Sequence, residues 1–195
     1  MTGHCDSEQP PAPLIISLRR WVRRTLLRPR RSLYEKLYEA HARKHPDARA
    51  IGAKDDDFET LGRIEFEILR AEGLERNTAL LDFGCGTGRL AVQTIPYLTG
   101  GAYIGVDISP SMLKRAAETV ARACPAPSCR VAWVRQPWAR FLQDDASVDM
   151  ICAFSVFTHM EHEDTYLYLK EARRVVRPGG RLVLSCLPMD SALAR

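Results

Sequence analysis

The fold of this chain is decided by a glycine-rich turn, Leu80-Leu81-Asp82-Phe83-Gly84-Cys85-Gly86-Thr87-Gly88-Arg89. Three glycines occupy alternate positions between an apolar run that predicts a strand and a segment that predicts a helix. At such a turn glycine lets the backbone adopt positive φ and approach a ligand closely, and the helix start presents N–H groups to an anion. Nineteen residues after Gly88, Asp107 ends the next predicted strand, where a carboxylate can accept hydrogen bonds from both ribose hydroxyls.

The spacing of the glycines discriminates between cofactors. A dinucleotide-binding turn has the pattern G-x-G-x-x-G, and the sixth position of that pattern is Arg89 here. Hydride transfer from a nicotinamide cofactor is therefore disfavoured. A role in packing alone would explain one such glycine. It fits poorly with three glycines at a strand-to-helix turn that is followed by an acidic residue.

Outward from the turn, short apolar runs alternate with helical segments, which is the pattern of a parallel sheet covered on both faces. The predicted strands are 79–83, 103–107, 131–134, 150–154 and 181–187. The predicted helices are 32–45, 58–71, 89–98, 110–123 and 163–176. We therefore predict an α/β fold with an open, mostly parallel sheet of five strands and helices on both faces.

Four stretches resemble the motifs of class I S-adenosylmethionine-dependent methyltransferases. They are Leu80–Leu90, with an acid two residues before its first glycine, and Tyr103–Leu113, Asp149–Cys152 and Leu169–Leu184. The resemblance extends over roughly residues 58–187 and is specific for the fold rather than for the substrate. It implies a Rossmann-like methyltransferase fold, S-adenosyl-L-methionine as the cofactor, and methyl transfer to an unidentified acceptor, which we expect to be a small molecule.

The resemblance also implies cofactor-binding residues, which lie at or just beyond the predicted strands: Asp82, Gly84, Cys85, Gly86, Gly88, Asp107, Ile108, Met112, Gln136, Trp138, Phe154 and Ser155. The glycine turn would contact the methionine part of the cofactor, and Asp82 would hold its amino group. Asp107 would bind the ribose, while Ile108 and Met112 would line the adenine. Phe154 and Ser155, at the end of the fourth predicted strand, would lie near the sulfonium.

Adenine recognition departs from the family pattern. The family often has an acidic residue after the third strand that accepts a hydrogen bond from the adenine amino group, whereas this chain has Gln136-Pro137-Trp138 there. Two alternatives stay open. Gln136 could accept that bond through its side-chain oxygen, or Trp138 could stack on the ring.

A candidate general base lies after the fourth predicted strand, where ligands bind in open parallel sheets. Methyl transfer mainly requires alignment of the two reactants, and a base is needed only when the acceptor atom is protonated. His159 is the predicted catalytic residue, with His162 and Glu161 as weaker candidates. A structural role for His159, in capping the next helix or in bonding to the backbone, is the alternative. We predict no metal site, because this H-x-x-H pair has no third ligand at a recognisable spacing.

Length and composition limit the classes of protein to which the chain can belong. The chain has 195 residues, 46% hydrophobic and 27% charged, which is enough for one packed domain. No apolar run reaches the length of a membrane span. The six cysteines form no C-x-x-C pair, which favours a reducing compartment and hence a cytoplasmic location.

Charge separates an N-terminal extension from the rest of the chain. Residues 1–50 hold 11 Lys and Arg against 5 Asp and Glu, a net charge of +6, and residues 51–195 hold 17 against 19, a net charge of −2. We therefore predict a basic extension over 1–50 and the methyltransferase domain over 51–195. Residues 14–28 predict an amphipathic helix rich in arginine. Packing on the protein itself, contact of Arg19–Arg31 with an anionic membrane surface or a nucleic acid, and targeting remain alternatives.

The C-terminal end of the sequence raises a second hypothesis about function. In the family that the chain resembles, the sheet continues beyond the fifth strand with a helix and two more strands, whereas this sequence stops eight residues after Leu187. A truncated or non-catalytic relative that binds the cofactor and acts through dimerisation or a partner is therefore the alternative. An exposed fifth strand would favour a homodimer, because an unpaired edge can pair with another chain.

Overall fold

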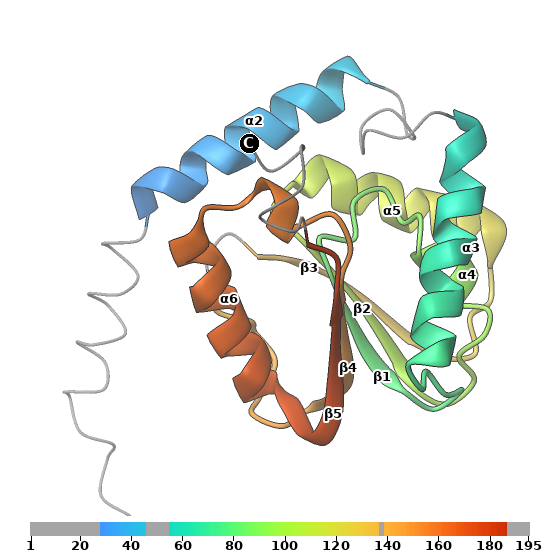
Figure 1. Cartoon of the computed structure of the whole chain (residues 1–195). Coiled ribbons are helices and arrows are strands. Elements are labelled where there is room, and N and C mark those ends of the chain that lie inside the picture. The colour runs from blue at the N-terminus through green and yellow to red at the C-terminus, as the bar shows by residue number, and fades with distance from the viewer. Residues whose placement is uncertain (1–27, 46–54, 137–138, 187–195) are drawn as a thin grey trace, which may run out of the picture.

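The computed structural model describes residues 28–45, 55–136 and 139–186 (Figure 1). Within these residues the chain forms a five-stranded sheet in the order β3-β2-β1-β4-β5. The strands are β1 (Ala79–Phe83), β2 (Ala102–Asp107), β3 (Arg130–Arg135), β4 (Val148–Ala153) and β5 (Val176–Leu184). Every neighbouring pair is parallel, which confirms the predicted fold class.

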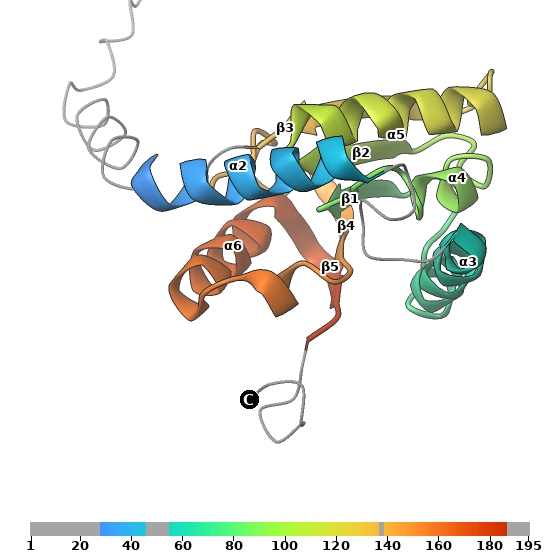
Figure 2. The same ribbon diagram turned by 90° about the horizontal axis from the view of Figure 1, so that it is seen from above.

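Helices lie on both faces of this sheet and across one end of it (Figures 1 and 2). They are α2 (Arg28–Lys44), α3 (Asp55–Ala71), α4 (Ala91–Thr94), α5 (Pro110–Ala123), the short 3-10 helix η2 (Phe157–His159) and α6 (His162–Val175). Helices α3, α4 and α5 are on one face, and α6 is on the other. The helix predicted over 14–28 falls outside the described residues, except for Arg28, with which α2 begins. The proposed domain boundary at residue 50 also falls outside them.

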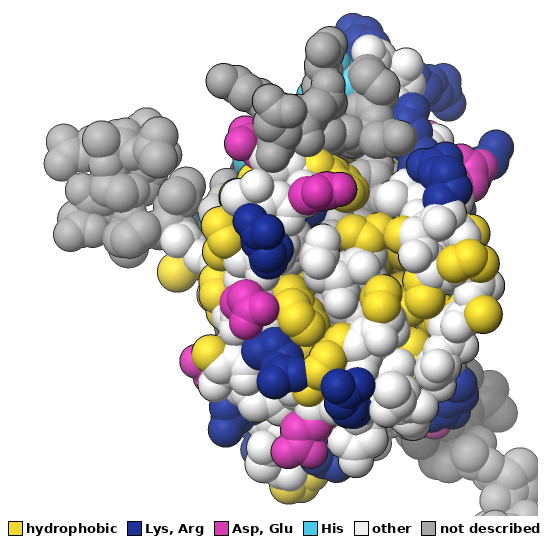
Figure 3. All heavy atoms as spheres, turned by 90° about the vertical axis from the view of Figure 1, so that its right-hand side faces the viewer, with side chains coloured by type: hydrophobic (Ala, Val, Ile, Leu, Met, Phe, Trp, Pro, Cys, Tyr) yellow, Lys and Arg dark blue, Asp and Glu magenta, His cyan; other side chains and the backbone are white. Residues whose placement is uncertain are grey.

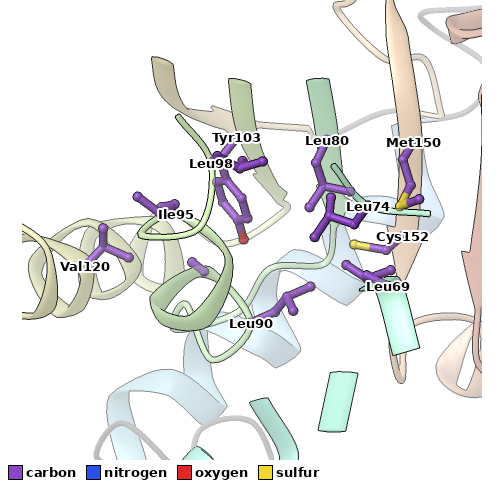
Figure 4. Packing of buried hydrophobic residues seen from close by; sticks show 11 residues of the cluster. Leu69, Leu74, Leu80, Leu90, Ile95, Leu98, Tyr103, Val120, Met150 and Cys152 are labelled. Atoms are coloured by element: carbon purple, nitrogen blue, oxygen red, sulfur yellow. The ribbon is translucent and has the colours of Figure 1, made fainter. Parts of the chain in front are cut away.

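The two faces of β1 are buried in two separate hydrophobic clusters, as the alternation of side chains along a strand requires. Leu80 packs with Leu69 of α3 and Tyr103 of β2 in the cluster under α3, α4 and α5 (Figure 4). Leu81 points to the other face and packs with Tyr168 of α6. Leu80 and Leu81 are fully buried, and each such leucine stabilises the fold by about 1.5–3 kcal/mol relative to an exposed one.

The helix predicted over 89–98 is interrupted, and only α4 keeps regular helical geometry. Four amides in this stretch still bond to the carbonyl four residues back, among them Val92 N to Gly88 O at 3.1 Å and Leu98 N to Thr94 O at 3.1 Å. Gln93 and Tyr97 instead bond to the carbonyl three residues back. The tighter turns accompany complete burial of Ile95 and Leu98, so packing overrides the local helical pattern here.

Strand β5 begins five residues before the predicted start. Its pairing with β4 shifts from Val148–Val176 to Met150–Arg181, so four residues of β5 bulge outward around Pro178-Gly179-Gly180. Gly179 has φ of 79°, which glycine adopts without strain. A bulge of this kind lets a strand resume pairing after residues that cannot follow the ladder, such as a proline, which has no N–H to donate.

Helix α3 turns its apolar stripe outward. Leu61, Ile64 and Ile68 are 36–48% exposed, whereas Leu69 is fully buried. Figure 3 shows hydrophobic side chains spread over this face of the molecule. The buried side of α3 instead carries Gly62 and Glu65, which brings a carboxylate toward the interior. No helix within the described ranges is long and apolar enough to cross a membrane.

Candidate active site

A cavity of about 680 Å³ opens at the carboxyl ends of β1, β2 and β4, which is within the usual size range of small-molecule pockets. Most of the residues predicted from the sequence line it: Asp82, Gly84, Cys85, Gly86, Asp107, Ile108, Met112, Gln136, Phe154, Ser155 and His159. Gly88 is not among the lining residues, and Trp138 falls outside the described residues. The tertiary structure thus gathers at one place residues that are up to 77 positions apart in the sequence.

The glycine turn is held in a conformation that requires glycine. Gly84, Gly86 and Gly88 have φ of 78°, 54° and 90°, the left-handed region that side chains disfavour. The amides of Gly84 and Cys85 both donate to the carbonyl of Val106, at 2.7 and 3.1 Å. A Cβ on Gly84 would lie 2.4 Å from Cγ2 of Val156, and one on Gly88 would lie 3.2 Å from Cα of Ala116. Gly88 therefore packs the turn against α5, while Gly84 and Gly86 face the cavity.

Asp107 ties the end of β2 to the glycine turn. Its Oδ2 accepts a hydrogen bond from the amide of Gly86 at 3.0 Å, and its Oδ1 accepts one from the amide of Ser109 at 2.8 Å. Burial raises the pKa of the Asp107 carboxyl to about 6, although these backbone hydrogen bonds lower it. Each carboxylate oxygen has two lone pairs, so Asp107 can still accept bonds from a ligand.

Asp82 lies beneath the turn in a small buried polar cluster. Its Oδ2 accepts a hydrogen bond from the hydroxyl of Tyr103, and its Oδ1 accepts one from Sγ of Cys152 at 3.5 Å. Burial raises the pKa of Asp82 to about 7, opposed by the Tyr103 bond and reinforced by the charge of Glu65. Sequence reasoning identified Asp82 but not its two partners, because they come from the neighbouring strands β2 and β4.

An ion pair that was not predicted as part of the site also lines the cavity. Nε of Arg89 donates to Oε2 of Glu65 at 3.2 Å, and Nη2 of Arg89 donates to Oε1 of the same side chain. Burial raises the pKa of Glu65, although the Arg89 guanidinium lowers it. The sequence analysis used Arg89 only to exclude a dinucleotide turn and did not select Glu65, which lies on the buried side of α3.

Helix α2 contributes two further lining residues, Leu37 and His41. They are one helical turn apart and so share one side of the helix. On an adjacent side, Glu39 accepts hydrogen bonds from the hydroxyls of Ser109 and Ser111, at 2.5 and 2.6 Å, and from the amide of Ser111 at 3.1 Å. These bonds attach α2 to the first turn of α5, where Ser109 also caps the helix by accepting from the amide of Met112.

More contacts between α2 and the rest of the protein support the attachment. Arg115 donates to the carbonyl of Ala42 at 2.5 Å and to that of His45 at 2.8 Å. Glu35 forms an ion pair with Arg135 at the end of β3. None of these contacts was predicted, since they join residues 70 to 100 positions apart. A hint was available in the sequence, because Leu33, Leu37 and Ala40 have helical spacing.

His159 ends η2 and is solvent-exposed at the edge of the cavity. The segment before it is fixed by two features. Ser155 has φ of 57°, and its amide donates to the hydroxyl of Ser185 at 2.7 Å. The weaker candidates lie elsewhere: Glu161 is the N-cap of α6 and His162 is its first residue, and neither lines the cavity. Asp164 and Tyr168 of α6, which were not predicted, do line it.

Two groups of lining residues come from different parts of the fold. The turn group consists of Gly84, Gly86, Asp107, Ile108 and Met112, from the ends of β1 and β2 and the start of α5. The α2–α6 group consists of Leu37, His41, Val156, His159, Met160, Asp164 and Tyr168. Because β1 lies between β2 and β4 in the sheet, the segment after β4 adjoins the turn group, where Val156 packs on Gly84.

Comparison with protein families identifies the class of the chain. A family described as a methyltransferase domain matches residues 80–180, which are more than half of the 195-residue sequence. This region contains the glycine turn, Asp107 and the segment after β4. The chain therefore belongs to the methyltransferase domain family, which confirms the family that the sequence motifs predicted.

Two characterised relatives show how far the similarity extends. The malonyl-[acyl-carrier protein] O-methyltransferase of Dechloromonas aromatica (strain RCB) is 33% identical over 143 residues, which are 71% of this chain and 48% of that protein. The 27-O-demethylrifamycin SV methyltransferase of Amycolatopsis mediterranei (strain S699) is 32% identical over 137 residues, 68% of this chain and 48% of that protein. The chain thus spans about half the length of these relatives.

Among solved structures, the fold is similar to phosphoethanolamine N-methyltransferase 1 of Haemonchus contortus, determined in complex with phosphoethanolamine and S-adenosylhomocysteine. The TM-score is 0.65 at 20% sequence identity, and the match covers 83% of this chain and 33% of that one. The coverage of this chain extends beyond the family match. At this level of identity the similarity establishes the fold.

Proposed function

We propose that this protein is an S-adenosyl-L-methionine-dependent methyltransferase that acts on a small-molecule acceptor. Family membership supports the reaction class. The observation that carries the proposal is the junction of the glycine turn and Asp107, joined by the Gly86 hydrogen bond, at the edge of a cavity of about 680 Å³. The cofactor would supply a methyl group on a positively charged sulfur.

The residues present fit this cofactor. Gly84 and Gly86 offer a surface without side chains, at a position where even a Cβ on Gly84 would clash with Val156. Asp107 presents carboxylate oxygens for the ribose hydroxyls, next to the apolar side chains of Ile108 and Met112, which would line the adenine. Gln136 is buried and also lines the cavity, which favours it for the adenine contact.

The acidic lining suits a cofactor that carries positive charge. Asp82 lies behind the turn and lines the cavity, and each of its carboxylate oxygens accepts one protein hydrogen bond, so it keeps lone pairs with which it would hold the amino group of the cofactor. Phe154 and Ser155 follow β4 and would flank the reacting sulfur. Cys85 is buried in the turn, and burial raises the pKa of its thiol well above the usual range, so it would act as a neutral packing group.

We propose His159 as the general base for an acceptor that carries a proton. It lines the cavity and is exposed to solvent, which would let the proton leave to water. Its backbone is fixed by the bond from its amide to the carbonyl of Val156 at 3.1 Å. General bases of this kind contribute typically about 10²–10⁴-fold to a rate.

Titration calorimetry with S-adenosylhomocysteine tests the proposal. The wild-type chain should bind it, and Asp107→Asn should weaken binding about 10- to 100-fold, because hydrogen bonds to a charged group contribute about 1.5–3 kcal/mol. Asp144→Asn is the matched control, since Asp144 is exposed and does not line the cavity. Failure of the wild-type chain to bind, or equal binding by wild type and Asp107→Asn, would refute the proposal.

The cellular setting also belongs to the proposal. The described cysteines, Cys85, Cys124, Cys129, Cys152 and Cys186, are all free thiols, which supports a reducing compartment and hence a cytoplasmic location. Contact of Arg19–Arg31 with an anionic membrane surface or a nucleic acid stays a prediction. So does a homodimer through β5, which is the last strand of the described sheet.

A further inference from the structure

We propose that the α2–α6 group forms an acceptor compartment for an uncharged, planar molecule that presents a phenol-type hydroxyl. The inference rests on the proposed function, because it assigns the acceptor for the same site. It is carried by three properties of the cavity: the exposed apolar side chain of Leu37 on the α2 wall, an aromatic floor at the end of β1, and the charges of the lining residues.

The wall is formed by a helix that is firmly attached but has an apolar side chain uncovered. Leu37 lines the cavity and is 57% exposed, and His41 stands next to it one helical turn away. The bonds of Glu39 to Ser109 and Ser111 hold α2 in place at this position. A large exposed apolar side chain at the edge of a pocket favours an apolar ligand, because the ligand would remove that surface from water.

The floor is a cluster of aromatic rings around Phe83. Its ring centroid lies 4.5 Å from that of Tyr168, 5.3 Å from that of Phe141 and 6.1 Å from that of Phe157. Phe83 and Tyr168 also line the cavity, although each is only 5–6% exposed. These packed rings give the cavity a rigid aromatic border, which a planar acceptor can contact edge to face.

The charges around the cavity disfavour an anionic acceptor. Of the described lining residues, four carry carboxyl groups: Glu65, Asp82, Asp107 and Asp164. A single guanidinium, Arg89, lies among them, and it is already engaged by Glu65. An acceptor with a carboxylate or phosphate would meet no fixed cation to pair with among these residues, because Arg89 is held by Glu65, and an unpaired charge in the site is costly. An uncharged acceptor avoids that cost.

The histidines select the kind of hydroxyl. The pKa of a phenol is about 10, like that of the tyrosine side chain. An aliphatic hydroxyl is far less acidic, with a pKa near that of water, so a base removes its proton much less readily. An imidazole at His159 can therefore activate a phenol-type hydroxyl far more readily than an alcohol.

The reaction then balances without any further reagent. The acceptor oxygen gives its proton to the His159 imidazole and forms a bond to the methyl carbon, while the carbon–sulfur bond breaks and leaves its electron pair on sulfur. The positive charge passes from sulfur to the imidazolium, which returns the proton to solvent. The products are the methyl ether and S-adenosylhomocysteine.

Three matched acceptors test the inference on the full chain: 2-naphthol, 6-hydroxy-2-naphthoic acid, which adds a carboxylate, and decahydro-2-naphthol, whose hydroxyl is aliphatic. Methyl ethers are measured by mass spectrometry with S-adenosylmethionine present, and S-adenosylhomocysteine binding is measured separately. We expect methylation of 2-naphthol with kcat/KM at least about tenfold above either analogue.

Equal or faster methylation of either analogue would overturn the inference, as would binding of S-adenosylhomocysteine without methylation of 2-naphthol. Absence of S-adenosylhomocysteine binding would instead remove the proposed function itself.

A variant separates the α2 wall from the cofactor. Leu37→Asp should weaken 2-naphthol binding, followed by the fluorescence of the ligand, about tenfold or more, because it places a charge in the apolar wall, and should leave S-adenosylhomocysteine binding unchanged. Ile64→Asp is the matched control, since Ile64 is 48% exposed on α3 and does not line the cavity. Equal 2-naphthol affinity in wild type and Leu37→Asp would contradict the assignment of α2 to the acceptor.

Discussion

The turn group and the α2–α6 group line one cavity, but they are constructed differently. The turn group comes from residues 84–112, a continuous segment that holds the glycine turn, α4, β2 and the start of α5, and its shape follows from glycines at positive φ and from one acid at the end of β2. The α2–α6 group joins residues near position 40 to residues near position 160. The side proposed for the cofactor is therefore built locally, while the side proposed for the acceptor depends on distant segments that packing brings together.

The largest effect is expected when the proposed base, His159, is removed from the α2–α6 group while the turn group stays intact. His159→Gln should reduce kcat about 10²–10⁴-fold with a phenolic acceptor, with S-adenosylhomocysteine affinity unchanged. His162→Gln is the control, because His162 does not line the cavity. Stopped-time assays and calorimetry measure the two quantities. Full activity of His159→Gln would assign this histidine to the structural role considered from the sequence.

The next prediction breaks the turn group. Gly84→Ala and Gly179→Ala each add a Cβ atom to a residue with nearly the same φ, 78° and 79°. The Cβ at position 84 would lie 2.4 Å from Cγ2 of Val156, whereas the Cβ at position 179 would have open space around it. Positive φ alone costs a residue with a Cβ about 1–2 kcal/mol. Chemical denaturation should show a loss near that value for Gly179→Ala and a larger one for Gly84→Ala. Only Gly84→Ala should also lose S-adenosylhomocysteine binding; retained binding would show that the turn can adapt.

The third prediction concerns the buried carboxyl beneath the turn. The folded-state pKa of Asp82 is about 7, raised from 3.8 by burial, so the folded protein binds more protons than the unfolded chain between these values. Asp82 therefore makes the free energy of unfolding fall as pH rises from about 4 to about 7, by up to about 1.4 kcal/mol per pH unit. The stability difference between Asp82→Asn and wild type, measured by denaturation across this range, should shift in favour of the variant as pH rises. A difference that does not change with pH would contradict the raised pKa.

The smallest expected effect concerns the link between the two groups. Partial burial raises the pKa of Glu39, but the bonds from Ser109 and Ser111 lower it overall, so it should attach α2 as a carboxylate. Glu39→Gln weakens charge-assisted bonds that exceed neutral ones by roughly 1 kcal/mol, so 2-naphthol affinity should fall about fivefold. Hydrogen exchange should quicken in α2 but not in β1. Lys36→Gln is the control, since Lys36 lies on the same helix and is exposed to solvent. Unchanged exchange in α2 would show that other contacts suffice to hold it.

The described strands agree with the sequence-based expectation except at β5, where the bulge before Arg181 could not be anticipated from a Pro-Gly-Gly stretch that reads as a loop. The segment 89–98 was mispredicted for a different reason. Its periodicity indicates a continuous helix, but burial of Ile95 and Leu98 imposes tighter turns. Both differences arise where the backbone adjusts to neighbouring elements rather than to its own local preferences.

At the site, the residues that the sequence identified are those whose function depends on their immediate neighbours. Glycines between a strand and a helix, and an acid at the end of the following strand, define a ligand-binding turn because backbone conformation and strand direction are local properties. Gly88 illustrates the limit of that inference, since the same pattern does not show whether a glycine faces a ligand or, as here, packs against α5.

The tertiary structure alone decided which side chains face these residues. Glu65 meets Arg89, Tyr103 and Cys152 hold Asp82, and α2 covers one side of the cavity, through contacts between residues 21 to 72 positions apart. No local pattern specifies such pairs, because they form only when separate amphipathic elements bury their faces against a common sheet. The sequence by itself thus determined the methyltransferase fold and its cofactor turn, whereas packing determined the electrostatics of the turn and the shape of the space proposed for the acceptor.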